Sequence, residues 1–97
     1  MNINQLRKIL KAKLRPLKRR VQVLHFWELL KMRYIKHLEV RDIENCYQIK
    51  EISGSWKVVT MERNLIREKK VFDEEKEACL YFNELMKRMY QNELSNP

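Results

Sequence analysis

The sequence predicts an α+β fold in which N-terminal helices precede a three-stranded antiparallel sheet, and a C-terminal amphipathic helix packs across that sheet. Residues 46–72 alternate apolar and polar side chains around two short turn signals, which is typical of strands with one buried face. Residues 78–90 carry apolar side chains at three- and four-residue intervals, which is typical of a helix with one buried face. A chain of 97 residues supports one hydrophobic core, so we expect residues 1–97 to form a single domain.

The first helix is predicted over residues 3–14. Its apolar side chains recur at helical spacing and form one face, whereas basic side chains occupy the rest; the apolar residues are Ile3, Leu6, Leu10 and Leu14, with Ile9 beside them. Asn2 or Asn4 is suited to cap its start. The helix should end or kink at the Arg15–Pro16 step, because a residue before proline avoids helical geometry and proline lacks a backbone donor.

A second helix is predicted over residues 21–38. An apolar stripe at helical spacing runs through this segment and is formed by Val23, Phe26, Trp27, Leu30, Tyr34 and Leu38. Residues 21–27 are also β-branched and aromatic, so a strand is the alternative there. The length of the pattern favours the helix. Residues 39–45 are polar and are predicted to connect this helix to the sheet.

The first two strands are predicted as a hairpin, Cys46–Ile52 and Trp56–Glu62, joined by a turn at Gly54, the only glycine of the chain. In the second strand, Trp56, Val58 and Thr60 share one face, and the opposite face is formed by Lys57, Val59 and Met61.

The third strand is predicted over Leu65–Phe72 after a turn at residues 62–64. Asn64 is the best candidate in that turn for a positive φ, since asparagine tolerates the left-handed conformation better than any residue except glycine. The middle of this strand is charged, which suits a sheet edge because lysines there discourage further pairing.

The last helix is predicted to begin with Asp73 as its N-cap and acidic side chains in its first turn, where the helix dipole favours negative charge. Its apolar stripe should cover the sheet and consists of Ala78, Cys79, Phe82, Leu85, Met86, Met89 and Tyr90.

The net charge of +8 is carried by one segment. Between Arg7 and Arg20 there are eight basic residues and no acidic residue, whereas Lys and Arg equal Asp and Glu in number over the rest of the chain. The chain is therefore predicted as a basic amphipathic helical arm, residues 1–20, attached to a charge-balanced strand–strand–strand–helix unit, residues 46–90.

No constellation in the sequence predicts catalysis, a metal or a cofactor. The histidines and cysteines, His25, His37, Cys46 and Cys79, include no closely spaced ligand pair, and Cys79 falls on the buried stripe of the last helix. One glycine cannot build a phosphate-binding loop. Without such a constellation, we expect a protein that is not an enzyme. No apolar run approaches a membrane-spanning length or resembles a signal peptide, so we expect a cytoplasmic protein.

The basic segment fits three kinds of partner, and a solvated helix face that binds no partner is the alternative. As a nucleic-acid contact, residues 7–20 would neutralise phosphates, although no aromatic side chain is interleaved for base stacking. As an interfacial membrane helix, the segment would insert residues such as Leu6 and Leu10. As a docking surface for an acidic protein, it would accelerate encounter.

Two stretches resemble small bacterial immunity proteins of contact-dependent inhibition and related polymorphic toxin systems. They are the run from Ser53 to Asn64, with its glycine turn before a tryptophan strand and its Glu62–Arg63 pair, and the run from Val71 to Phe82. Asn64 stands where that family usually has a glycine. The resemblance covers a little under half of the chain, and residues 1–45 have no counterpart in it.

The resemblance implies a protein that binds and neutralises one cognate toxin domain by occluding its active site or access route. The basic charge implies a toxin that is acidic or is not a nuclease, since inhibitors of nucleases tend to be acidic. The alternative is a small nucleic-acid-binding accessory protein that uses residues 7–20. The candidate partner-binding residues are exposed positions of the arm and the sheet: Arg7, Lys11, Arg15, Lys18, Arg19, Arg20, Lys57, Glu62, Arg63 and Arg67. The oligomeric state and the identity of the toxin stay open.

Overall fold

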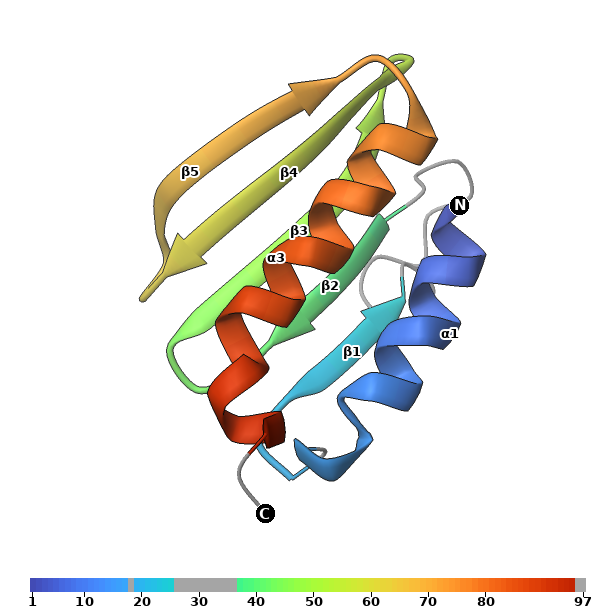
Figure 1. Ribbon diagram of the computed structural model, residues 1–97. Helices are drawn as coiled ribbons and strands as arrows, with labels where there is room; N and C mark the ends of the chain where they lie inside the picture. Colours follow the sequence, from blue (N-terminus) through green and yellow to red (C-terminus); the bar gives the residue numbers. More distant parts are fainter. Residues whose placement is uncertain (18, 26–36, 96–97) are drawn as a thin grey trace.

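The computed structural model describes residues 1–17, 19–25 and 37–95, which form one antiparallel sheet with two α-helices on the same face (Figure 1). The helices are α1 (Ile3–Lys13) and α3 (Glu75–Ser95), and a 3-10 turn follows α1 at Arg15–Leu17. The five strands lie side by side in chain order: β1 (Gln22–His25), β2 (His37–Arg41), β3 (Asn45–Ile52), β4 (Ser55–Glu62) and β5 (Leu65–Phe72). The α+β class is confirmed.

The sheet has five strands rather than the three predicted, because β1 and β2 occupy part of the predicted second helix. They pair antiparallel, with Val23 opposite Val40 and Leu24 opposite Glu39. The helix over residues 21–38 is therefore wrong at both of its described ends, and the strand alternative holds for residues 22–25; residues 26–36 of that prediction lie outside the described residues. Of residues 39–45, predicted as a connection, residues 39–41 belong to β2 and Asn45 belongs to β3, so the connection is limited to residues 42–44.

Helix α1 follows its prediction closely. Asn2 caps it, with the Asn2 side chain accepting from the Gln5 N–H and the Gln5 side chain accepting from the Asn2 N–H, each at 2.9 Å. The helix ends at Lys13, before Pro16. Its predicted apolar face is buried in the same core as the sheet, through Ile3, Leu6, Leu10 and Leu14.

Two tight turns join the last three strands. In the β3–β4 turn, Ser53 and Gly54 have φ values of 52° and 83°, and in the β4–β5 turn Arg63 and Asn64 have values of 51° and 67°. Positive φ at both central residues twists a hairpin in the sense that its strands require. The left-handed conformation predicted for Asn64 is confirmed, and Arg63 shares it.

Strand β5 has the predicted bounds and forms an edge of the sheet. Its register shifts by one residue near Arg67, because Thr60 pairs with Glu68 whereas Met61 pairs with Ile66. Most of its side chains are exposed, although Tyr81 of α3 donates to Glu68 at 2.8 Å. This contact fastens the edge strand to the helix that covers the sheet.

Helix α3 begins two residues after Asp73. The Ala78 N–H donates to the Glu74 carbonyl at 3.2 Å, so Glu74 rather than Asp73 occupies the N-cap position. The predicted apolar stripe is buried except at Met89, which is 45% exposed. Glu75 also accepts a hydrogen bond of 2.8 Å from the Ile3 N–H, which joins the starts of the two helices.

The core lies between the sheet and the two helices. Its sheet side is formed by Leu38, Val40, Tyr47, Ile49, Trp56 and Val58, and α1 and α3 supply the other side. No helix among the described residues combines the length and the hydropathy needed to cross a membrane.

Candidate protein-binding site

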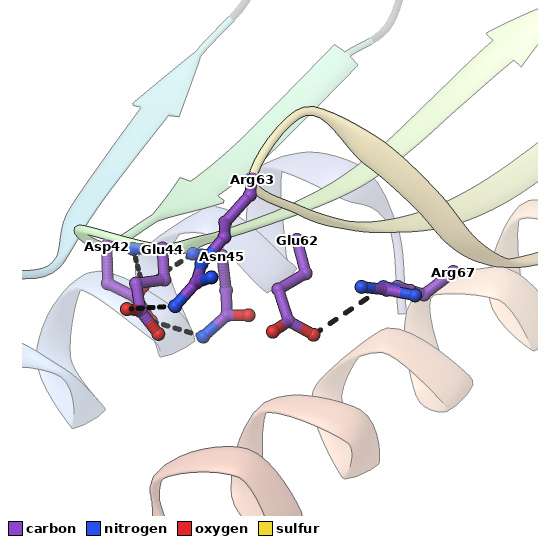
Figure 2. Close-up of polar contacts among 6 residues, drawn as sticks. All are labelled: Asp42, Glu44, Asn45, Glu62, Arg63 and Arg67. Atoms are coloured by element: carbon purple, nitrogen blue, oxygen red, sulfur yellow. Dashed lines mark hydrogen bonds and ion pairs between the residues drawn. The ribbon is translucent and has the colours of Figure 1, made fainter.

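The β2–β3 loop, residues 42–44, is the centre of the candidate site. Three neighbouring surface hollows, of about 370, 300 and 260 Å³, all have Asp42 and Ile43 in their walls. Both α-helices run toward this end of the sheet, and the β4–β5 turn lies beside the loop (Figure 2). The hollows therefore mark one continuous surface at the end of the sheet.

Asp42 organises the loop. Its Oδ1 atom accepts from the backbone N–H groups of Glu44 and Asn45 at 2.9 and 2.8 Å, and its own N–H donates to the Asn45 carbonyl at 2.9 Å. Its Oδ2 atom accepts from the hydroxyl of Tyr90 in α3 at 2.6 Å. Burial alone would raise the pKa of Asp42, but these hydrogen bonds to the carboxylate outweigh burial and hold its pKa below the ordinary value.

A second set of contacts fixes the loop to the β4–β5 turn. The Arg63 N–H donates to the Glu44 carbonyl at 2.8 Å, and the Arg63 guanidinium lies 3.3 Å from the Glu44 carboxylate (Figure 2). The backbone hydrogen bond joins the β2–β3 loop to the β4–β5 turn, so we expect the loop and the turn to move together.

Ile43 stands at the tip of this fixed loop and is 89% exposed. Most exposed apolar side chains need no explanation, but the neighbours of Ile43 in sequence, Asp42 and Glu44, are both engaged in holding the loop. The fold thus presents a large apolar side chain on a rigid support.

Arginines surround Ile43 on two sides. Arg19, Arg20 and Arg41 line the 260 Å³ hollow, and Arg63 lines the 370 Å³ hollow together with Arg41. We call this surface the arginine end; it consists of Arg19, Arg20, Arg41, Asp42, Ile43, Glu44 and Arg63.

The side chain of Arg41 is positioned by a buried carboxylate. Glu39, whose side chain is 3% exposed, forms an ion pair with Arg41 and accepts from the Gln48 amide at 2.7 Å. Glu39 raises the pKa of Arg41 through its charge. The guanidinium of Arg41 is therefore held in place while remaining half exposed.

Some of the predicted binding residues gather here and others do not. Arg19, Arg20 and Arg63 belong to the arginine end, and Glu62 lies next to Arg63 in ion-pair contact with Arg67 at 3.6 Å (Figure 2). Arg15 is exposed in the 3-10 turn that follows α1.

The remaining candidates are more dispersed. Arg7 and Lys11 lie along α1, where Arg7 is half-buried and Lys11 is exposed. Lys57 pairs with Lys50 near the opposite end of β4. Lys18 lies outside the described residues.

Sequence reasoning misses Ile43, Arg41 and Asp42 because it predicts residues 39–45 as a connection without a role of its own. A signal is present: an aspartate side chain commonly accepts from the backbone amide two residues on and so favours a tight turn, and Asp42 stands in a polar stretch. That signal gives a loop but does not say which strands it joins.

The described residues hold no group of three or more His, Cys, Asp and Glu side chains that would suit a metal ion. Burial raises the pKa of Cys46 and of Cys79 to about 11, so both thiols are protonated and poorly nucleophilic at neutral pH. His37 is buried, and neither of its ring nitrogens has a hydrogen-bond partner among the residues that the structure describes.

Comparison with known proteins found no matching family model, no matching curated protein and no matching solved structure.

Proposed function

We propose that this chain is a bacterial immunity protein, acting in the cytoplasm, that binds a cognate toxin domain and neutralises it by occluding its active site or access route. Its role is stoichiometric binding without chemistry of its own. The sequence resemblance of residues 53–64 and 71–82 to such proteins motivates the proposal.

The observation that carries the proposal is the exposed Ile43 on a loop fixed by Asp42 and Glu44. Protein interfaces concentrate their binding energy in a few apolar or arginine side chains, and a rigid support lowers the entropy lost on binding. Ile43, with arginines in the walls of the hollows beside it, has this composition.

Co-expression with the domain encoded immediately upstream of this chain tests the proposal. Rescue of growth, together with a stoichiometric complex on gel filtration, is the expected result. An upstream frame that encodes no toxic domain, or a toxic domain that this chain neither binds nor counteracts, would refute it.

A nucleic-acid-binding function is the second candidate, and one observation favours it. Exposed basic side chains continue from the last turn of α1 into the segment before β1: Lys11, Lys13, Arg15, Arg19 and Arg20. Such a track would bind short DNA or RNA without sequence preference, and its affinity would fall by orders of magnitude from low to moderate salt. Absence of binding at low salt would dismiss it.

A further inference from the structure

We infer that the arginine end recognises an acidic protein surface that contains an apolar pocket, with Ile43 filling the pocket and Arg19 and Arg41 pairing with carboxylates around it. This inference rests on the proposed function, because it specifies which kind of surface on the toxin domain is bound. Three properties of the arginine end lead to it.

The first property is that the arginine end has its own carboxylates already engaged. Asp42 is bound by the Tyr90 hydroxyl and by two backbone amides, and Glu44 lies within ion-pair distance of Arg63. Arg41 is paired with the buried Glu39 but stays half exposed, and Arg19 is exposed, so both guanidinium groups can offer N–H donors to an arriving partner. Arginine binds carboxylates with two parallel hydrogen bonds, so acidic side chains are the natural complement of this hollow.

The second property is the position of Ile43 in the wall of all three hollows. Any partner whose acidic groups reach the arginines must also cover Ile43. If the partner covered Ile43 with a flat, charged surface, the partner's polar groups would lose water and gain no hydrogen bond in return, which is unfavourable. The partner surface should therefore offer an apolar pocket at that point, with its carboxylates on the rim.

The third property is the positive charge of the arginine side chains at this surface, which limits how the chain can inhibit a toxin. A toxin cleft that binds nucleic acid must be basic, and a basic cleft would repel the arginine end. Inhibition of a nuclease by this chain would then occur from an acidic surface beside the cleft, without imitation of a phosphate backbone. A toxin with an acidic active-site cleft could be blocked directly.

Two substitutions and two matched controls test the inference, using the full chain and the upstream-encoded toxin domain. Ile43→Asp removes the apolar contact, and Ile52→Asp changes an isoleucine that is 42% exposed beside the β3–β4 turn, at the other end of the sheet. Arg19→Glu reverses one charge of the arginine end, and Lys76→Glu reverses an exposed charge near the start of α3. None of the four side chains is in the core, so each variant should fold, as circular dichroism will verify.

Ile43→Asp is expected to weaken the complex roughly tenfold or more, as loss of a central interface residue does. Arg19→Glu is expected to slow association severalfold at low salt and to reduce the dependence of the association rate on salt. Ile52→Asp and Lys76→Glu should leave affinity nearly unchanged.

The outcomes separate the inference from the proposed function. A wild-type complex that Ile43→Asp and Arg19→Glu leave intact would overturn the inference and keep the immunity function. A chain that forms no complex with the domain would remove both, and binding to a short DNA duplex instead, with steep salt dependence, would assign the basic side chains to nucleic acid.

Discussion

Asp42 shows how one side chain can position a binding surface without contacting the partner. Its carboxylate holds the backbone of the loop from within and accepts the Tyr90 hydroxyl from α3. Tyr90 is buried and forms an edge-to-face contact with Tyr47 of β3 at 6.1 Å between ring centroids. The Tyr90 hydroxyl thus connects the loop that carries Ile43 to the hydrophobic core.

Tyr90→Phe tests this connection. The substitution keeps the ring and removes the hydrogen bond to Asp42, so the free energy of unfolding should fall by about 1–2 kcal/mol at neutral pH. Urea denaturation measures the change. An unchanged unfolding free energy would show that the hydroxyl does not hold the loop.

The pH dependence of stability tests the same hydrogen bond through its acceptor, the Asp42 carboxylate. The pKa of Asp42 is lowered in the folded state, so the unfolded chain takes up the proton first. The stabilisation is present above the ordinary aspartate pKa and is lost as the pH falls below about 4. Asp42→Asn should lack this component of the pH profile, and the difference between wild type and Tyr90→Phe should shrink over the same range.

His37 makes the free energy of unfolding depend on pH in a separate, higher range. Burial lowers its pKa; the charge of Lys50 acts in the same direction, and that of Glu39 opposes it. Because the unfolded chain binds the proton more readily, stability is highest above pH 6.5 and falls as the pH drops from 6.5 toward the folded pKa. His37→Gln should flatten the unfolding free energy in this range, as measured by urea denaturation at a series of pH values; a loss of stability equal to that of the wild type would contradict the assignment.

At the scale of elements, the hairpins are the part of the fold that the sequence predicts best. Gly54 and Asn64 each mark a turn, and the bounds of β5 follow from Asn64 before it and the acidic helix start after it. The signals are local: a positive φ is needed at those positions, and few residues tolerate it.

Asn64 offers a direct test of that argument. Asn64→Ala should lower the free energy of unfolding by about 1 kcal/mol, because an alanine at a φ of 67° is strained. Asn64→Gly, the matched control, removes the strain and should retain the stability of the wild type or slightly exceed it. Thermal denaturation compares the three proteins; equal losses for alanine and glycine would show that the asparagine side chain, rather than its backbone conformation, matters.

The strands β1 and β2 could not be predicted with the same reasoning. Leu38 and Val40 are buried on the core side of β2, but Glu39 between them is buried as well, and it is stabilised there by Arg41 and Gln48. A buried glutamate is rare unless it is paired. Arg41 lies in the same strand, but Gln48 lies in β3, and no local pattern gives the register between β2 and β3. The candidate site depended on the same missing information, because Ile43 and Arg41 follow from the β2–β3 pairing.

On the scale of the whole molecule, the fold brings arginines from separate parts of the sequence to one surface. Helix α1 buries its apolar face and exposes its three lysines, and the chain after it leads Arg19 and Arg20 to the β2–β3 loop. Arg41 and Arg63 come to the same place from β2 and from the β4–β5 turn. The basic N-terminal segment and the sheet therefore both contribute to the arginine end.

Hydrogen–deuterium exchange on the complex with the upstream-encoded toxin domain tests the central claim most directly. Binding through the arginine end predicts slower amide exchange over residues 41–45 and 62–65, with unchanged exchange at the β3–β4 turn over residues 52–57. Slower exchange at the β3–β4 turn, with no change around Ile43, would contradict the account.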